Sequence, residues 1–139
     1  MACMLRLGGK ELDVKSLIRS FNLEVSKVWI KGEAKFRNRP DKLNTNSGLN
    51  IIVSDAEFNE FSLQKEQAEV YLSDNLEQLK KVVQYQGVDN VYIDFGIEWR
   101  DVYIQSDYFP ASLVKLAGEI GLGIEITQYS PEGSDEHET

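Results

Sequence analysis

The hydrophobic pattern of this chain switches between two periods, and this switch most constrains its fold. Apolar and polar residues alternate in short segments such as residues 91–97, a pattern typical of β-strands that bury one face. Between residues 62 and 84 the apolar residues recur at steps of three or four, the spacing of one helix face. A chain that interleaves both periods is predicted to be an α+β protein.

The segments favour the order β-α-β-β-α-β-β-α-β. Strands are expected over residues 3–7, 24–36, 49–54, 90–97, 101–106 and 122–129, and helices over residues 12–21, 62–84 and 111–120. Asp13 is expected to cap the first helix, Pro110 to begin the last, and Gly121 to end it. We predict a single mixed, largely antiparallel sheet with about three helices packed on one face, and the other face partly wet.

Two connections in this order are predicted from turn chemistry. Residues 37–48 contain Pro40, Gly48, three Asn and a Ser, which favours a long irregular loop. The four residues 98–101, "EWRD", separate two alternating segments and have a suitable length for a β-hairpin. We therefore expect residues 101–106 to pair with the strand that precedes them.

Length and composition indicate one domain of ordinary size. The chain has 139 residues, which predicts a domain over residues 1–129 and an acidic, disordered tail over residues 130–139. The single cysteine excludes an intrachain disulfide, and no stretch has the apolar length of a signal peptide or membrane span. We expect a cytoplasmic protein without a membrane partner.

The chain is acidic, because Lys and Arg total 15 against 23 Asp and Glu, a formal net charge of −8. This charge argues against nucleic acid as a partner and makes a basic protein the better choice. The alternative interpretation is that the charge serves solubility alone, as in most acidic proteins. The charge is uneven, because residues 27–42 hold six bases and two acids, whereas residues 88–110 hold five acids and only Arg100.

The acidic segment is also rich in aromatic residues. In the expected hairpin these side chains point away from the apolar row of Val91, Ile93 and Phe95, as anchors at protein interfaces do. The predicted partner-binding residues are Tyr92, Asp94, Glu98, Trp99, Asp101, Tyr103 and Asp107. Solvated acids and aromatics packed under a second layer are the alternative interpretation.

Catalytic patterns are sparse. The only histidine, His137, lies in the expected tail, and Cys3 lies in an expected strand. No zinc, P-loop or nucleophile-elbow motif is present, so we expect no catalytic residue, metal or cofactor. The alternatives are a small-molecule-binding or structural homodimeric domain, and a metal-dependent hydrolase that uses Asp94, Glu98 and Asp101.

The C-terminal segment from Val91 to Tyr129 resembles the ending of small uncharacterised bacterial domains. It holds a strand pair, a helix begun by Pro110 with the pattern "LVKLAGEIG", and a last strand ending in an aromatic residue. Some such domains are similar to immunity proteins that accompany bacterial toxins. The resemblance implies an immunity or binding protein. The small acidic domain, the lack of catalytic motifs and the acidic, aromatic segment lead us to expect a non-enzymatic protein, a monomer or homodimer. We expect it to neutralise a basic toxin domain by occluding its active site.

Overall fold

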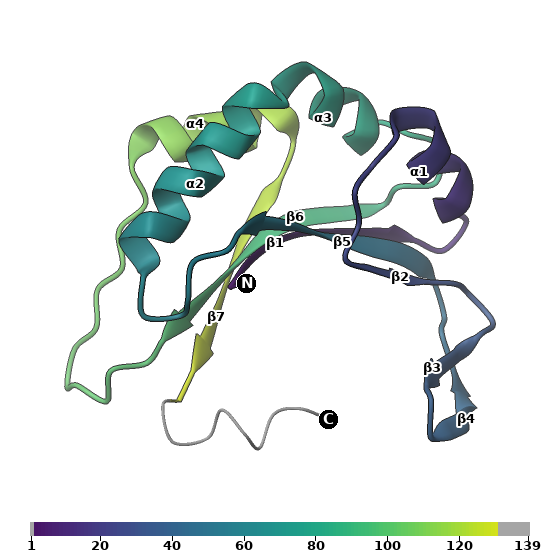
Figure 1. Cartoon of the computed structure of the whole chain (residues 1–139), viewed down its shortest axis with the longest axis horizontal. Coiled ribbons are helices and arrows are strands. Elements are labelled where there is room, and N and C mark those ends of the chain that lie inside the picture. Colours follow the sequence, from purple (N-terminus) through teal and green to yellow (C-terminus); the bar gives the residue numbers. More distant parts are fainter. Residues whose placement is uncertain (1, 131–139) are drawn as a thin grey trace.

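The computed structural model describes residues 2–130, and it places four helices on one face of a five-stranded sheet (Figure 1). The strands are β1 (Cys3–Gly9), β2 (Lys27–Trp29), β3 (Ala34–Phe36), β4 (Arg39–Leu43), β5 (Ser47–Ser54), β6 (Asn90–Glu98) and β7 (Gly123–Tyr129). The helices are α1 (Val14–Phe21), α2 (Phe61–Asp74), α3 (Leu76–Val83) and α4 (Ala111–Ile120). The predicted α+β class is confirmed. Of the predicted tail, all but Ser130 lies outside the described residues.

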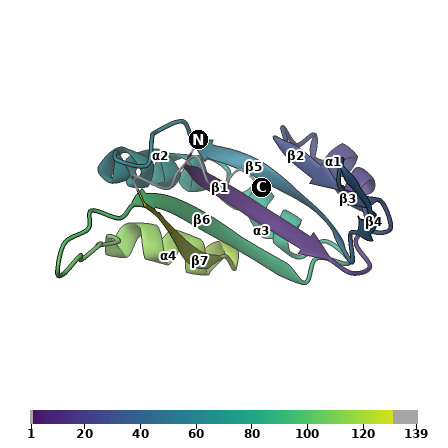
Figure 2. The ribbon, with the colours of Figure 1, turned by 90° about the horizontal axis from the view of Figure 1, so that it is seen from below.

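The main sheet has the order β2-β5-β1-β6-β7, and β3 pairs with β4 in a separate two-stranded sheet. β1 pairs antiparallel with β5 and with β6, and β2 pairs antiparallel with β5. Only β6 and β7 are parallel, and α4 connects them. Three of the four pairings are therefore antiparallel, as predicted. Figure 2 shows the face that carries no helix, which we call the open face.

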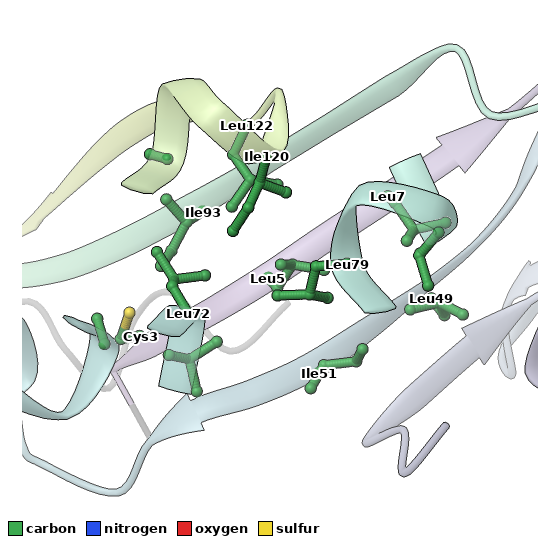
Figure 3. Packing of buried hydrophobic residues seen from close by; sticks show 14 of the residues in the cluster. Cys3, Leu5, Leu7, Leu49, Ile51, Leu72, Leu79, Ile93, Ile120 and Leu122 are labelled. Atoms are coloured by element: carbon green, nitrogen blue, oxygen red, sulfur yellow. The ribbon is translucent and has the colours of Figure 1, made fainter. Parts of the chain in front are cut away.

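The helix-side face of the sheet supplies the core. Alternate residues of β1, β5 and β6 point to this side, where they meet apolar side chains of the helices (Figure 3). Leu72 of α2 and Leu79 of α3 are almost fully buried there. Because side chains alternate along a strand, the residues between these core positions necessarily face the opposite side.

Local helix signals in the sequence are confirmed. The Asp13 carboxylate accepts a hydrogen bond from the Ser16 backbone N–H at 3.1 Å and so caps α1. Gly121 ends α4 with φ of 101°, a left-handed conformation that glycine adopts without steric strain.

The prediction of one helix over residues 62–84 is wrong, because the chain breaks between α2 and α3. The Asn75 side-chain Nδ2 donates to the Tyr71 backbone carbonyl at 2.9 Å, in competition with regular helical bonding. Asn75 itself has φ of −114°, outside the helical range. The apolar spacing continues across the break, which is why the pattern alone concealed it.

The prediction of an irregular loop over residues 37–48 is also wrong. β3 and β4 form a hairpin in which Phe36 pairs with Arg39, and β5 already begins at Ser47. Pro40 fits because β4 has a partner on one edge only, so the missing N–H breaks no ladder. In Figure 1 this hairpin descends from the sheet on the side opposite the helices.

The expected hairpin between residues 90–97 and 101–106 does not form. Both edges of β6 are occupied, by β1 and by β7, so no edge remains for a returning strand. Asp101 adopts φ of 51°, which interrupts extended backbone. Residues 99–110 instead form a loop without regular structure that leads into α4.

We predict that Leu72→Ala lowers the free energy of unfolding by about 2–5 kcal/mol, because it leaves a cavity in the core. Val70 lies on the same helix but is 60% exposed, so Val70→Ala is a matched control expected to change stability by about 0.5 kcal/mol or less. Urea unfolding with unchanged slopes measures both. Equal midpoints for the two variants would contradict this assignment of the core.

Cys3 provides a prediction for the pH dependence of stability. Burial, and secondly the charge of Asp94, raise the pKa of the Cys3 thiol from 9.0 to about 12. The neutral thiol therefore contributes stability fully below pH 9, and this contribution is lost as pH rises towards 12. At pH 10.5 we expect the stability difference between wild type and Cys3→Ala to fall by about 1–2 kcal/mol from its value at pH 8. A difference independent of pH would show that the thiol ionises normally.

Candidate functional site

Three of the predicted partner-binding residues lie on the open face of β6. Tyr92, Asp94 and Glu98 occupy alternate positions of this strand, opposite in direction to the core residues Ile93 and Phe95. Tyr92 and Glu98 are partly exposed, whereas Asp94 is only 6% exposed. Asp94 is therefore part of the packed structure of the sheet rather than of its accessible surface.

The Asp94 carboxylate is held by residues from both neighbouring strands. Arg6 Nε of β1 donates to its Oδ2 at 3.1 Å, and Thr127 Oγ1 of β7 donates to its Oδ1 at 2.7 Å. Arg6 Nη1 in turn donates to the Asn50 Oδ1 of β5 at 2.9 Å when the amide oxygen faces it. This network ties four adjacent strands together and fixes the Arg6 guanidinium.

Arg6 and Thr127 were not predicted from the sequence as partners of Asp94. Alternation along the first strand predicts that Arg6 lies on the face opposite Leu5 and Leu7, and the sequence gives no further indication of its partner. The register that brings Arg6 beside Asp94 depends on pairing between residues 88 positions apart, and no local pattern encodes it.

The other four predicted residues, Trp99, Asp101, Tyr103 and Asp107, lie in the loop of residues 99–110. Side chains close its base, because the Gln105 amide accepts from Arg100 N at 3.0 Å and donates to the Asp107 carboxylate at 3.0 Å. Arg100 and Asp107 also approach to 3.6 Å. The base of the loop is therefore clamped by its own polar groups.

The C-terminal arm of the loop is fixed to α2. Lys65 Nζ donates to the Tyr108 carbonyl at 2.7 Å and lies 4.3 Å from the centre of the Phe61 ring. Phe109 packs edge-on against Phe61 and Phe95, at ring-centre distances of 5.4 and 5.0 Å. Only the middle of the loop is left without such anchors.

The tip of the loop exposes apolar side chains. Val102 and Ile104 are 48% and 73% exposed, and Tyr103 is fully exposed. The loop projects away from the sheet in both views (Figures 1 and 2). We use the name docking tip for residues 101–104, the exposed middle of this loop.

The same end of the molecule is acidic. A groove of about 490 Å³ runs between the end of β5 and α2, and its described lining includes Asp55, Glu66 and Asp74 but neither Lys nor Arg. Burial, and secondly the Glu24 carboxylate, raise the pKa of Tyr71 in this groove. Because the described lining carries three carboxylates and neither Lys nor Arg, an approaching cation would encounter a favourable field here.

Asp94, Glu98 and Asp101 do not form a recognisable metal centre. Within residues 2–130, no group of three or more His, Cys, Asp or Glu side chains is arranged to hold an ion. The same part of the chain contains no helix of the length and hydrophobicity needed to cross a bilayer.

The geometry defines a class: an α+β domain with a helix-covered sheet, a polar open face and a projecting apolar loop at its acidic end. No family model, curated protein or solved structure matches the chain. Its function must therefore be inferred from its own residues.

We predict that Asp94→Asn lowers the free energy of unfolding by about 1–3 kcal/mol, because Arg6 loses its charged partner while the shape is kept. Glu125 is the register partner of Asp94 on β7 and is exposed, so Glu125→Gln is a matched control with little expected effect. Chemical denaturation compares the two. If both variants unfold at the wild-type midpoint, the network does not stabilise the sheet.

Proposed function

We propose that the protein is a non-enzymatic protein-binding domain that engages its partner through the docking tip. The observation that carries the proposal is the full exposure of Tyr103, beside exposed Ile104, on a loop whose base is clamped. Exposing these side chains to water is unfavourable in the isolated protein. A partner surface that covers them would recover that free energy.

The clamped base gives the loop the preorganisation that a binding element needs. Association orders flexible loops at a cost of about 0.5–1.5 kcal/mol for each immobilised side chain. Gln105 and the Arg100–Asp107 pair already hold the backbone on either side of Tyr103. Tyrosine also suits this position, because it is enriched among residues that dominate interface energetics.

The charge of this end supports a basic partner. Asp55, Glu66 and Asp74 line the groove between α2 and the end of β5, and complementary charge accelerates encounter and disfavours wrong partners. The expected strand pair of the C-terminal segment does not form, so its resemblance to immunity proteins rests on the helix that follows Pro110 and on the last strand. On this remaining resemblance we propose a bacterial toxin domain as the partner. Binding would occlude the basic active site of that toxin.

A homodimer is a second candidate, favoured by one observation. β7 is an edge strand of the main sheet, and its Ile124 and Ile126 are both more than one-third exposed. Uncovered strand edges are templates for pairing between chains. Light scattering from the purified chain distinguishes this candidate, because a partner-binding monomer has the mass of one chain.

The proposed partner for the test is the product of the reading frame next to the gene. We expect Tyr103→Ser combined with Ile104→Ser to weaken its binding at least 30-fold in calorimetric titration, because anchors of this kind contribute about 2 kcal/mol or more. Val114 on α4 is also an exposed apolar residue, so Val114→Ser is the control and should bind as wild type does.

Thermal unfolding checks that the double variant keeps its fold. Growth of cells that co-express the neighbouring product then tests neutralisation, and wild type should restore growth where the double variant does not. Unchanged affinity in a folded double variant would refute the docking tip, and absence of wild-type binding would refute this partner.

A further inference from the structure

A second concave site lies at the opposite end of the sheet, where the open face meets the β3–β4 hairpin. This pocket has a volume of about 280 Å³, and no Asp or Glu occurs among the described residues that line it. Apart from Asn and Thr, its lining consists of three cationic and three aromatic side chains: Arg6, Lys27, Lys35, Trp29, Phe36 and Tyr92. In a chain of net charge −8, this local composition is unlike the rest of the molecule.

The Trp29 ring is seated directly on the backbone of the neighbouring strand. Trp29 pairs with Gly48 in the register of β2 and β5, and a Cβ atom at Gly48 would lie 2.3 Å from the ring carbon Cζ2. Only glycine permits this contact. Trp29 Nε1 also donates to the Asn46 Oδ1 at 3.1 Å, so the ring is held in place before any ligand arrives.

The cations of the pocket differ in how they are balanced. Asp94 pairs with Arg6 at 3.1 Å and so compensates its charge. Among the described residues, neither Lys27 nor Lys35 has a carboxylate within ion-pair distance, and the nearest aromatic contact of Lys35 is the Phe36 ring at 6.0 Å. Two ammonium groups therefore remain available to an anion.

The remaining wall limits the size and orientation of a ligand. Tyr92 closes the pocket on the side of β6, and burial, followed by the Glu125 carboxylate, raises the pKa of its hydroxyl. A negative ligand group is therefore disfavoured beside Glu125 and favoured beside the lysines. The volume of about 280 Å³ is just below the roughly 300–1,000 Å³ usual for small-molecule pockets, which favours a ligand no larger than a mononucleotide.

We propose that this pocket binds a small phosphate-bearing heteroaromatic molecule of the nucleoside monophosphate class. Lys27 and Lys35 contact the phosphate, and Trp29 provides the face on which the ring stacks. The Asn46 Oδ1 already accepts from Trp29, so the Nδ2 of the same amide is the group that can donate to the ring edge. The proposal is independent of the docking tip, which lies at the other end of β6.

Tryptophan fluorescence tests the proposal directly. The chain has two tryptophans, so the variant Trp99→Phe leaves Trp29 as the only reporter. AMP, GMP, CMP and UMP are titrated separately. We expect at least one of them to change the Trp29 emission, with a dissociation constant below about 1 mM. Inorganic phosphate alone and the matching nucleoside alone should bind at least tenfold more weakly. Phosphate makes only the contacts with the lysines, and the nucleoside makes only the stacking contact with Trp29.

The charge requirement is tested by Lys27→Ala combined with Lys35→Ala, in the same Trp99→Phe background. We expect at least a tenfold loss of affinity for the nucleotide. Lys15 on α1 and Lys115 on α4 lie outside the pocket lining, so Lys15→Ala combined with Lys115→Ala removes equal charge and should leave affinity within twofold. Circular dichroism checks the fold of both variants.

Three results would overturn the proposal. The first is no emission change with any of the four nucleotides up to about 5 mM, well above the expected dissociation constant. The second is an equal loss of affinity in the Lys15/Lys115 control, which would indicate general charge attraction. The third is binding of a short single-stranded oligonucleotide at least tenfold tighter than the mononucleotide, which would assign the pocket to nucleic acid instead.

Discussion

The pairing of β6 on both of its edges is the constraint on which the rest of the structure depends. β1 binds one edge in antiparallel register, and β7 binds the other in parallel. A parallel neighbour requires a crossover, which α4 supplies. The chain must therefore leave the sheet after Glu98 and cannot turn back as a hairpin. The exposed loop of residues 99–110 is the consequence, so the docking tip follows from sheet topology rather than from local preference.

All four helices lie on one face of the sheet, and this placement determines what the open face can contain. Because the open face has no helical layer, its side chains must satisfy one another or water. Arg6, Asp94 and Thr127 do so across three strands. At the other end of the same face, Gly48 leaves space that the Trp29 ring fills. The network around Asp94 and the aromatic pocket therefore have the same cause, which is that no helix covers the open face.

The sequence predicted those features that a few neighbouring residues determine. Asp13 caps a helix and Gly121 ends one through local bonding and backbone conformation, and the alternation identified the core strands. The failures share a different cause. The break at Asn75, the β3–β4 hairpin and the missing partner for residues 101–106 each depend on competition between contacts. The acids and aromatic residues of the candidate site were evident in the sequence. Strand pairing, which the sequence does not show, buries the Asp94 carboxylate in the sheet and leaves residues 99–110 as an exposed loop.

Charge separation allows two ligands of opposite sign on one acidic chain. Tyr92 at the pocket and Glu98 at the base of the loop are six residues apart along β6, about 20 Å at strand spacing. Screening in physiological salt acts over about 8 Å, so each end presents its own field rather than the net charge. β5 and β6 both pair antiparallel with β1 and therefore run in the same direction. The C-terminal end of β5 leads to the acidic groove, and the C-terminal end of β6 leads to the loop with the docking tip. Asn50 of β5 and Tyr92 of β6, near the N-terminal ends of these strands, line the lysine-bearing pocket. The two proposed ligands, a basic protein and a small anion, would therefore not compete for surface.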